Sequence, residues 1–191
     1  LLGCYEMELH QAIEQVIASA PHRVINIGCS GGYYAVGFAN RIRDCSVFAY
    51  DIDASAREAC ERTAIVNGVA ERVRVKSECT STELQAIAGP GTFVFCDCEG
   101  YELQLLDPMA VPALRKTTII VELHDIWIPD LTPRLLRRFV ASHEISRLAT
   151  IPREAAQFPI LSTAGLADWE IELALSDFRP PTMTWAYMVP R

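Results

Sequence analysis

The sequence predicts an α/β protein built on a doubly wound, mostly parallel sheet of seven strands with an antiparallel hairpin at one edge. Short apolar runs typical of buried strands alternate with segments that suit helices, as in parallel sheets covered on both faces. Only the last two strands lack a strongly periodic helix between them, which favours an antiparallel pair. Residues 1–191 are enough for a single domain with a sizeable core.

The predicted elements follow one another in a regular order. A helix over Tyr5–Ala18, within an N-terminal segment 1–20, leads into the core. Strands are expected at Arg23–Ile27, Ser46–Asp51, Val73–Lys76, Thr92–Cys96, Thr117–Leu123, Glu144–Thr150 and Thr182–Val189. Helices are expected at Ala35–Ile42, Ala54–Asn67, Thr80–Ile87, Glu102–Leu106, from Thr132-Pro133 onward, and at Trp169–Leu175. Asp53 is suited to cap the second of these, and no large insertion is evident.

Composition argues against several classes of protein. The net charge is −7 and half of the residues are hydrophobic, which indicates a globular chain without broad affinity for nucleic acid or anionic membranes. No apolar run approaches the ~20 residues of a membrane-spanning helix. The seven cysteines include no C-x-x-C pair, so we expect reduced thiols rather than a zinc site. The chain is therefore expected to be cytoplasmic, with no nucleic-acid partner and no membrane insertion.

The most informative stretch is a glycine-rich turn between the first strand and the helix after it. The apolar run Val24–Ile27 ends in residues 28–32, Gly-Cys-Ser-Gly-Gly. Glycines let the backbone approach a ligand closely, and the N–H groups of a helix N-terminus face that ligand. Asp51 ends the second strand about twenty residues later, the spacing of an acid that binds ribose hydroxyls. Together they predict a nucleoside-containing cofactor at the carboxyl ends of two neighbouring strands.

Three known arrangements compete for this turn. A dinucleotide fold requires G-x-G-x-x-G, but Ser30 and Tyr33 stand at the second and third glycine positions. A nucleophile elbow, G-x-S-x-G, fits residues 28–32 and would make Ser30 the nucleophile of a serine hydrolase, yet such an elbow follows several strands. The S-adenosylmethionine loop of class I methyltransferases, with small residues at 28, 30 and 32, fits both the position and Asp51. We favour this third interpretation.

Four segments resemble the FkbM-type methyltransferases. Residues 26–33, N-I-G-C-S-G-G-Y, look like the first motif of that family. Residues 97–102, D-C-E-G-Y-E, resemble its D-V-E-G-x-E segment, and Val121–His124 resembles its E-I-H strand end. Tyr5–Leu9 looks like the Y-E-x-E-L helix that often precedes the first motif. The resemblance therefore runs over roughly the first two thirds of the chain.

The resemblance implies a class I, Rossmann-like fold, S-adenosylmethionine as methyl donor and usually a hydroxyl acceptor. The cofactor-binding residues are then expected to be Asn26, Gly28, Cys29, Ser30, Gly32, Asp51, Ile52, Cys79 and Asp97. In this assignment the loop holds the methionine and ribose, Asp51 binds the ribose, Ile52 covers the adenine and Cys79 lies near its edge. Two positions depart from the family, since Asn26 stands where it generally has Asp and Cys98 where it has Val.

Glu99 and His124 are the candidate catalytic residues. A hydroxyl acceptor must lose a proton, and an imidazole with an ordinary pKa near ~6.5 suits a general base at neutral pH. Glu99 follows Asp97 at the period of a strand, so it is expected on the same side of the chain. No metal ligand is assigned. As an alternative, the oxygen ligands and imidazole of Asp97, Glu99, Glu122, His124 and Asp125 would suffice for Mg²⁺.

We therefore predict an S-adenosylmethionine-dependent methyltransferase that O-methylates a hydroxyl group of a small molecule, a sugar or a lipid. Two alternatives stay open. One is a non-catalytic binding or scaffolding protein on a degenerate methyltransferase fold, which the amide at Asn26 and the short chain suggest. The other is a serine hydrolase that uses Ser30. Neither the acceptor nor the oligomeric state can be read from the sequence.

Overall fold

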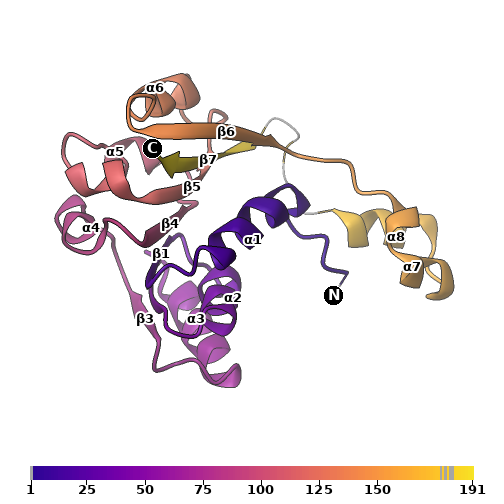
Figure 1. The fold of residues 1–191 in the computed structure, drawn as a ribbon. Helices are drawn as coiled ribbons and strands as arrows, with labels where there is room; N and C mark the ends of the chain where they lie inside the picture. Colours follow the sequence, from indigo (N-terminus) through magenta and orange to yellow (C-terminus); the bar gives the residue numbers. More distant parts are fainter. Residues whose placement is uncertain (1, 177, 179, 181–182) are drawn as a thin grey trace.

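The computed structural model describes residues 2–176, 178, 180 and 183–191. Its centre is a seven-stranded sheet in the order β3-β2-β1-β4-β5-β7-β6 (Figure 1). The strands are β1 (Arg23–Ile27), β2 (Ser46–Tyr50), β3 (Val73–Lys76), β4 (Thr92–Cys96), β5 (Thr118–Leu123), β6 (His143–Ala149) and β7 (Thr184–Pro190). Strands β1 to β5 pair in parallel, whereas β7 is antiparallel to β5 and β6. The predicted fold class and its antiparallel edge are confirmed.

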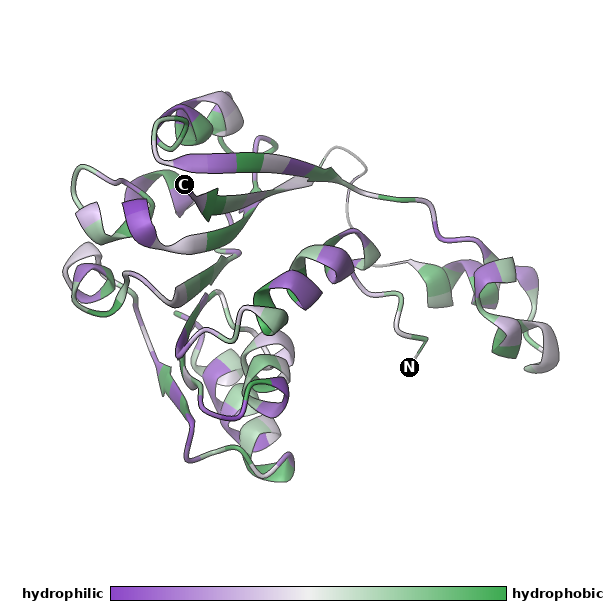
Figure 2. Cartoon of the chain, viewed as in Figure 1, coloured by the Kyte–Doolittle hydropathy of each residue, from purple (hydrophilic) through white to green (hydrophobic). Residues whose placement is uncertain are grey.

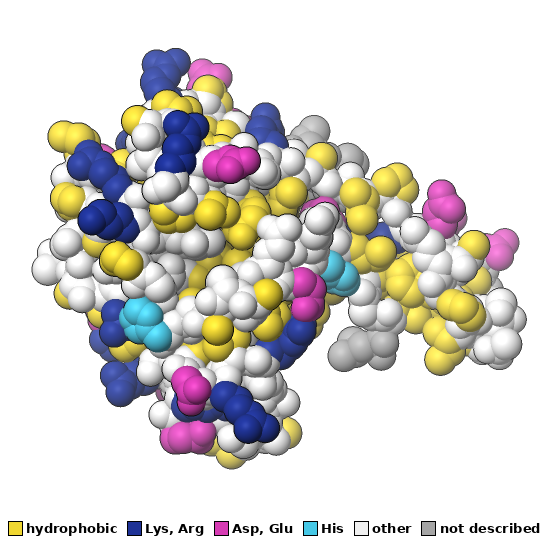
Figure 3. All heavy atoms as spheres, in the orientation of Figure 1, with side chains coloured by type: hydrophobic (Ala, Val, Ile, Leu, Met, Phe, Trp, Pro, Cys, Tyr) yellow, Lys and Arg dark blue, Asp and Glu magenta, His cyan; other side chains and the backbone are white. Residues whose placement is uncertain are grey.

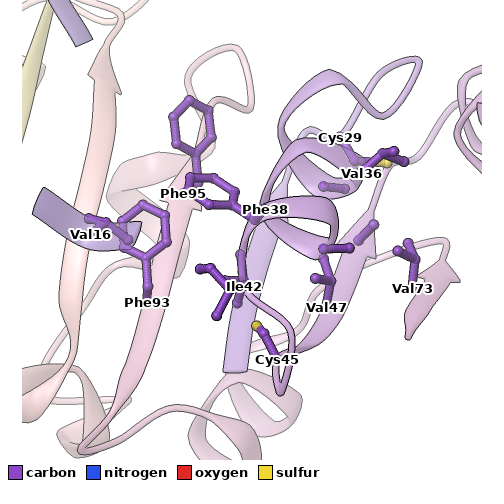
Figure 4. Packing of buried hydrophobic residues seen from close by; sticks show 14 of the residues in the cluster. Val16, Cys29, Val36, Phe38, Ile42, Cys45, Val47, Val73, Phe93 and Phe95 are labelled. Carbon is purple, nitrogen blue, oxygen red and sulfur yellow. The ribbon is translucent and has the colours of Figure 1, made fainter. Parts of the chain in front are cut away.

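Helices pack on both faces of the sheet. One group comprises η1 (Met7–Leu9), α1 (His10–Ala18), α2 (Tyr33–Arg41) and α3 (Ala54–Val66). The other comprises α4 (Ser81–Ile87), α5 (Glu102–Leu105), η2 (Pro112–Lys116) and α6 (Leu131–Arg137). Each group encloses its own apolar core against the strands, whose hydrophobic residues are green in Figure 2. In the first core the rings of Phe38, Phe93 and Phe95 gather between α2 and the sheet (Figure 4).

The register of the central strands determines where a site can form. Ile27 at the end of β1 is level with Tyr50 of β2 and Cys96 of β4. Because parallel strands run in the same direction, the chain leaves the sheet on the same side after each of these three strands. The residues that follow directly are Gly28, Asp51 and Asp97. Backbone pairing alone thus brings the glycine loop and two predicted acids together.

Most predicted boundaries agree with the structure to within two residues. Asp51 lies just after β2 instead of closing it, α2 begins at Tyr33, and α6 begins at Leu131. In the C-terminal hairpin, β7 inserts between β5 and β6, so β6 is the edge strand. The expected first residue of the last strand, Thr182, lies outside the described residues.

Between β6 and β7 the chain forms a projection that the sequence analysis did not anticipate. It carries η3 (Ala155–Gln157), α7 (Pro159–Thr163) and α8 (Asp168–Leu175), which extend away from the sheet (Figure 1). Figure 3 shows hydrophobic side chains on its surface. The sequence analysis expected the last of these helices, at Trp169–Leu175, but the short and weakly periodic helices did not reveal the projection as a whole. Within the described residues, no helix is both long and apolar enough to cross a membrane.

One guanidinium fastens the base of this projection to the N-terminal segment. The Nε of Arg153 donates to the carbonyl oxygen of Cys4 at 2.7 Å, and its Nη2 lies 3.3 Å from the Glu8 carboxylate. The side chains of Arg153 and Glu8 are almost fully buried. A charge-assisted pair shielded from water holds its partners more firmly than an exposed pair. The projection therefore leaves the body from a defined anchor.

His143, at the start of β6, is a buried histidine whose two ring nitrogens meet uncharged groups. Its Nε2 lies 2.9 Å from the carbonyl oxygen of Thr117 and its Nδ1 lies 2.9 Å from Oγ of Ser142. A carbonyl oxygen can only accept, so Nε2 carries the hydrogen. Burial lowers the pKa of His143, and the bond to Thr117 offsets part of that effect.

We expect this histidine to make the protein less stable in weak acid. Because its pKa is lower in the folded chain, its contribution is complete above the unfolded pKa of ~6.5 and is lost as the pH falls below that value. The free energy of unfolding should therefore decrease from about pH 6.5 to 5. His143→Gln, which keeps an N–H donor for Thr117, should show a shallower decrease in urea titrations. The exposed His22→Gln variant should keep the wild-type slope; equal slopes for all three proteins would contradict the assignment.

Candidate active site

A cleft of about 530 Å³ opens at the carboxyl ends of the parallel strands. Its lining consists of Tyr5, Ile27, Gly28, Ser30, Tyr50, Asp51, Ile52, Ser77, Glu78, Cys79, Asp97, Cys98, Glu99 and Tyr101. A hollow of the same volume lies between α1 and α2, but apolar and aromatic side chains dominate it and its lining includes none of the strand-end acids. The strand-end cleft gathers the acids and the glycine loop, so we take it as the candidate site.

The glycine loop is held against two neighbouring strands through backbone contacts. The N–H groups of Gly28 and Cys29 both donate to the carbonyl oxygen of Tyr50 at 2.9 Å. Gly28 adopts a φ of +76°, and a Cβ there would lie 1.6 Å from the carbonyl oxygen of Asp97. Gly32 has a φ of +88°, and a Cβ there would lie 2.9 Å from Sγ of Cys60. Both positions therefore require glycine on steric grounds.

Asp51 fastens the other side of the loop. Its Oδ2 accepts the N–H of Ser30 at 2.8 Å, and its Oδ1 accepts the N–H of Asp53 at 3.0 Å. A carboxylate has about four acceptor positions, so two remain for a ligand in the cleft. The helix-capping role belongs to Asp53, whose Oδ1 accepts the N–H of Ser55 at 2.8 Å, as the sequence predicted. Asp51 is thus available for a ligand.

The wall beside Asp51 suits a flat apolar group. Ile52 is 85% exposed on the rim of the cleft. Cys79 lines the opposite part and is almost fully buried, which raises the pKa of its thiol to about 12. The thiol is therefore neutral at physiological pH and acts as an apolar surface. An adenine ring would find apolar contacts here.

Three of the predicted cofactor residues lie outside the lining of the cleft. Gly32 is the N-cap residue of α2, and the side chain of Cys29 is buried in the core beside Val36 (Figure 4). The side chain of Asn26 is 1% exposed, and among the described residues neither Oδ1 nor Nδ2 has a hydrogen-bond partner. A buried amide that lacks hydrogen-bond partners destabilises the fold until a polar group forms hydrogen bonds with it. The sequence identified these positions but not the direction in which their side chains point.

His124 lies at the centre of a buried cluster of acids beside the cleft. Its Nδ1 is 2.8 Å from Oε1 of Glu102, and both side chains are fully buried. Its Nε2 lies 3.4 Å from Oε2 of Glu122 and 3.5 Å from Oδ1 of Asp97 and Oε2 of Glu99. Four carboxylates thus surround one imidazole. The sequence pointed to each of these residues, but it assigned no role to Glu102.

The cluster changes the protonation of His124. Burial alone would lower the pKa of the imidazole, but the hydrogen bond to Glu102 and the negative charges of Glu102 and Glu122 raise it to about 10. At neutral pH the ring therefore holds its proton, and the premise of an ordinary pKa near ~6.5 does not apply. A catalytic role for His124 stays a prediction, but the general-base chemistry first attached to it loses its support.

Glu99 is the more accessible of the two candidate catalytic residues. Its side chain is 73% exposed and lines the cleft, and its Oε2 accepts the indole N–H of Trp127 at 3.0 Å. The residue adopts a φ of +53°, an uncommon conformation for a residue with a side chain. Oε1 of Glu102 also accepts the N–H of Cys98 at 3.1 Å, so the same carboxylate holds this loop and His124. The strained loop is therefore braced from two sides.

The hydrolase interpretation finds no catalytic base near Ser30. Ser30 is exposed with a φ of +45°, and its backbone N–H is committed to Asp51. Within the described part of the chain, no hydrogen bond joins its hydroxyl to a histidine. A serine nucleophile needs such a base within reach. The loop geometry therefore favours a ligand-binding role for Ser30.

Several solved structures share this architecture. An O-methyltransferase from Bacillus cereus, in complex with S-adenosylhomocysteine, is 16% identical in sequence to this chain and superimposes with a TM-score of 0.58. The superposition covers 93% of this chain and 78% of the other. The O-methyltransferase TomG from Streptomyces achromogenes, in complex with S-adenosylmethionine, is 16% identical with a TM-score of 0.56, covering 92% and 77%. A methyltransferase from Geobacter sulfurreducens is 19% identical with a TM-score of 0.57, covering 71% and 69%.

No protein-family model and no curated protein matches the chain. The FkbM resemblance therefore stays a prediction. The structural likenesses are at low sequence identity, and they show the fold. The chain has the Rossmann-like fold of class I methyltransferases.

The close approach at Gly28 generates a stability prediction. Gly28→Ala forces a Cβ into the Asp97 carbonyl and should destabilise the protein by at least ~3 kcal/mol or prevent folding. Gly31→Ala is the matched control in the same loop, because nothing lies within 4 Å of a Cβ there and its φ is ordinary. Its effect should stay within about 0.5 kcal/mol. Chemical denaturation of both variants tests the packing, and similar losses in both would contradict it.

Proposed function

We propose that the chain is an S-adenosylmethionine-dependent methyltransferase whose acceptor is a hydroxyl group of a small molecule, a sugar or a lipid. One observation carries the proposal. A glycine loop that leaves β1 is held by Asp51 from β2 and packs on Asp97 from β4, so three strand ends enclose one cleft. The exposed Ile52 and the two open acceptor positions on Asp51 supply apolar and polar partners of the kind this cofactor needs.

Different residues of the cleft are assigned to different parts of the cofactor. When bound, S-adenosylmethionine supplies a methyl group on a positively charged sulfur. Gly28 and Ser30 offer close backbone approach to the methionine and ribose, Asp51 accepts the ribose hydroxyls, and Ile52 and Cys79 cover the adenine. Asp97, directly after β4, places a carboxylate in the lining of the cleft. Such a site works mainly by positioning.

The acceptor side is assigned to the edge formed by Glu99. An acceptor hydroxyl loses a proton when its oxygen is methylated, and Glu99 presents an exposed carboxylate in the same cleft. The braced loop restricts the positions that this carboxylate can take.

None of the seven cysteines forms a disulfide, which supports a reducing compartment such as the cytoplasm as the site of action.

Asp51→Ala should weaken S-adenosylmethionine binding by about 1.5–3 kcal/mol, the scale of hydrogen bonds to a charged group. This corresponds to a loss of about 10- to 150-fold in affinity. Asp53→Ala is a matched control, because it removes a neighbouring acid that caps α3 and does not line the cleft. Calorimetric titration of both variants, with thermal unfolding as a check on the fold, tests the assignment. Wild-type affinity in a folded Asp51→Ala protein would remove the proposed ribose contact.

Ser30→Ala should retain most cofactor binding and turnover, because the loop uses the backbone N–H of this residue. A nucleophilic serine would lose several orders of magnitude in rate on the same change. Treatment with a serine-directed fluorophosphonate gives an independent readout. Covalent labelling at Ser30 would favour the hydrolase. Binding of the cofactor without turnover of any hydroxyl acceptor would favour the non-catalytic alternative.

A further inference from the structure

The cluster around His124 has the geometry of a metal site. The Nε2 of His124 is fully buried and, among the described residues, makes no hydrogen bond of good geometry. It points at carboxylate oxygens of Glu122 and Asp97, 3.4 and 3.5 Å away. One ligand atom from each of these three residues can lie within 4.8 Å of the others. We propose that Asp97, Glu122 and His124 bind a divalent transition-metal ion beside the cleft.

The distances favour an ion over a proton as the group that joins these side chains. A charge-assisted N–H···O bond is about 2.7–2.9 Å long, clearly shorter than the contacts at Nε2. Ligands held at about 2.1 Å from an ion lie about 3.0 Å apart in octahedral and about 3.4 Å apart in tetrahedral coordination. The separations of 3.4 and 3.5 Å from Nε2 to Glu122 and Asp97 are close to this range, and small side-chain shifts would complete either geometry. A proton on Nε2 can form a hydrogen bond to only one carboxylate oxygen. An ion between Asp97, Glu122 and His124 contacts all three side chains at once.

Glu102 gives the imidazole the orientation that a metal ligand needs. Its Oε1 accepts the N–H of Nδ1 at 2.8 Å, so Nε2 faces the acids, and an ion that binds there displaces the proton of Nε2. Metal-binding histidines almost always donate their second ring nitrogen to such a carboxylate or carbonyl. Glu102 is fully buried and also accepts the N–H of Cys98, so its carboxylate is held in place. We class Glu102 as a positioning residue.

The donor set selects the class of ion. One imidazole nitrogen and two carboxylate oxygens suit ions between the hard and soft extremes, such as Mn²⁺, Fe²⁺, Co²⁺ or Zn²⁺, better than Mg²⁺. Asp125, which the sequence offered as a ligand, is not in the cluster, because its Oδ1 accepts the N–H of Thr132 at 3.1 Å and its Oδ2 accepts the Thr132 hydroxyl. It caps α6 instead.

The site adjoins the cleft through Asp97. Asp97 lines the cleft and its side chain is 21% exposed, whereas Glu122 and His124 are buried and do not line it. Three protein ligands leave coordination positions open, as in catalytic metal centres. Resting on the proposed function, we assign these positions to the acceptor hydroxyl, whose ionised form a nearby cation stabilises. The binding of the ion itself does not depend on that function.

The test uses Mn²⁺ as the probe, because seven cysteines offer thiols to Zn²⁺ but thiols bind Mn²⁺ poorly. Protein treated with EDTA and dialysed is titrated with Mn²⁺ and followed by electron paramagnetic resonance. We expect one bound ion per chain. Asp97→Asn and Glu122→Gln should each weaken binding at least tenfold, and Glu102→Gln by about 10- to 100-fold. Asp125→Asn is the matched control and should keep wild-type affinity.

Circular dichroism and thermal unfolding check that each variant is folded. If the buried Glu122→Gln or Glu102→Gln protein fails to fold, the partly exposed Asp97→Asn variant still decides the question. No binding by the wild type at about 1 mM Mn²⁺, a concentration that detects even weak sites, would overturn the proposal. Wild-type affinity in a folded Asp97→Asn protein would overturn it as well.

Separate titrations distinguish this proposal from the proposed function. Mn²⁺ is titrated without S-adenosylmethionine, and S-adenosylmethionine is titrated in the presence of EDTA. Metal binding without cofactor binding supports the metal site and removes the methyltransferase assignment. Cofactor binding without metal binding does the reverse. Turnover by the folded protein that persists unchanged in EDTA would overturn the assignment of the open positions to the acceptor.

Discussion

The close contact between the glycine loop and the end of β4 is the constraint on which the site depends. Gly28 turns the chain out of the sheet at a point where a Cβ would meet the Asp97 carbonyl oxygen at 1.6 Å. Because the loop lies this close to β4, Ser30 reaches the Asp51 carboxylate and Asp97 borders the same cleft. The sheet supplies a rigid base for these contacts through its continuous parallel pairing. A larger residue at position 28 would separate the elements that the cleft requires.

The second constraint is electrostatic and lies beside the first. Burying acids without compensation is unfavourable, yet Glu102 and Glu122 are fully buried next to His124. The charged imidazole compensates part of this negative charge, which is why its pKa is high. An ion bound between Asp97, Glu122 and His124 would compensate more of it. The protein thus holds a group of mutually compensating charges beside its cleft.

The arrangement also separates stability from function. The two apolar cores lie above and below the sheet, and the acids gather at one edge where the strands end. Side chains of the loop follow the same division, since Cys29 joins the core while Ser30 faces the cleft. The projection between β6 and β7 belongs to neither core, and Ile160 and Trp169 are each 65% exposed on it. Its anchor at Arg153 ties it to the N-terminal segment, from which Tyr5 reaches the cleft.

The sequence by itself determined the fold class, the strand boundaries and the edge of the sheet at which the site forms. Apolar periodicity and glycine positions are local properties, so the strand at Val24–Ile27 and the turn after it could be predicted from the sequence. Only the tertiary structure decided which side chains meet. The pairing of His124 with Glu102, and the pKa that follows from it, depends on β5 and α5 being neighbours in space. The direction of Cys29 depends on packing, and the projection rests on an anchor between segments about 150 residues apart. Such contacts join residues that no local pattern connects.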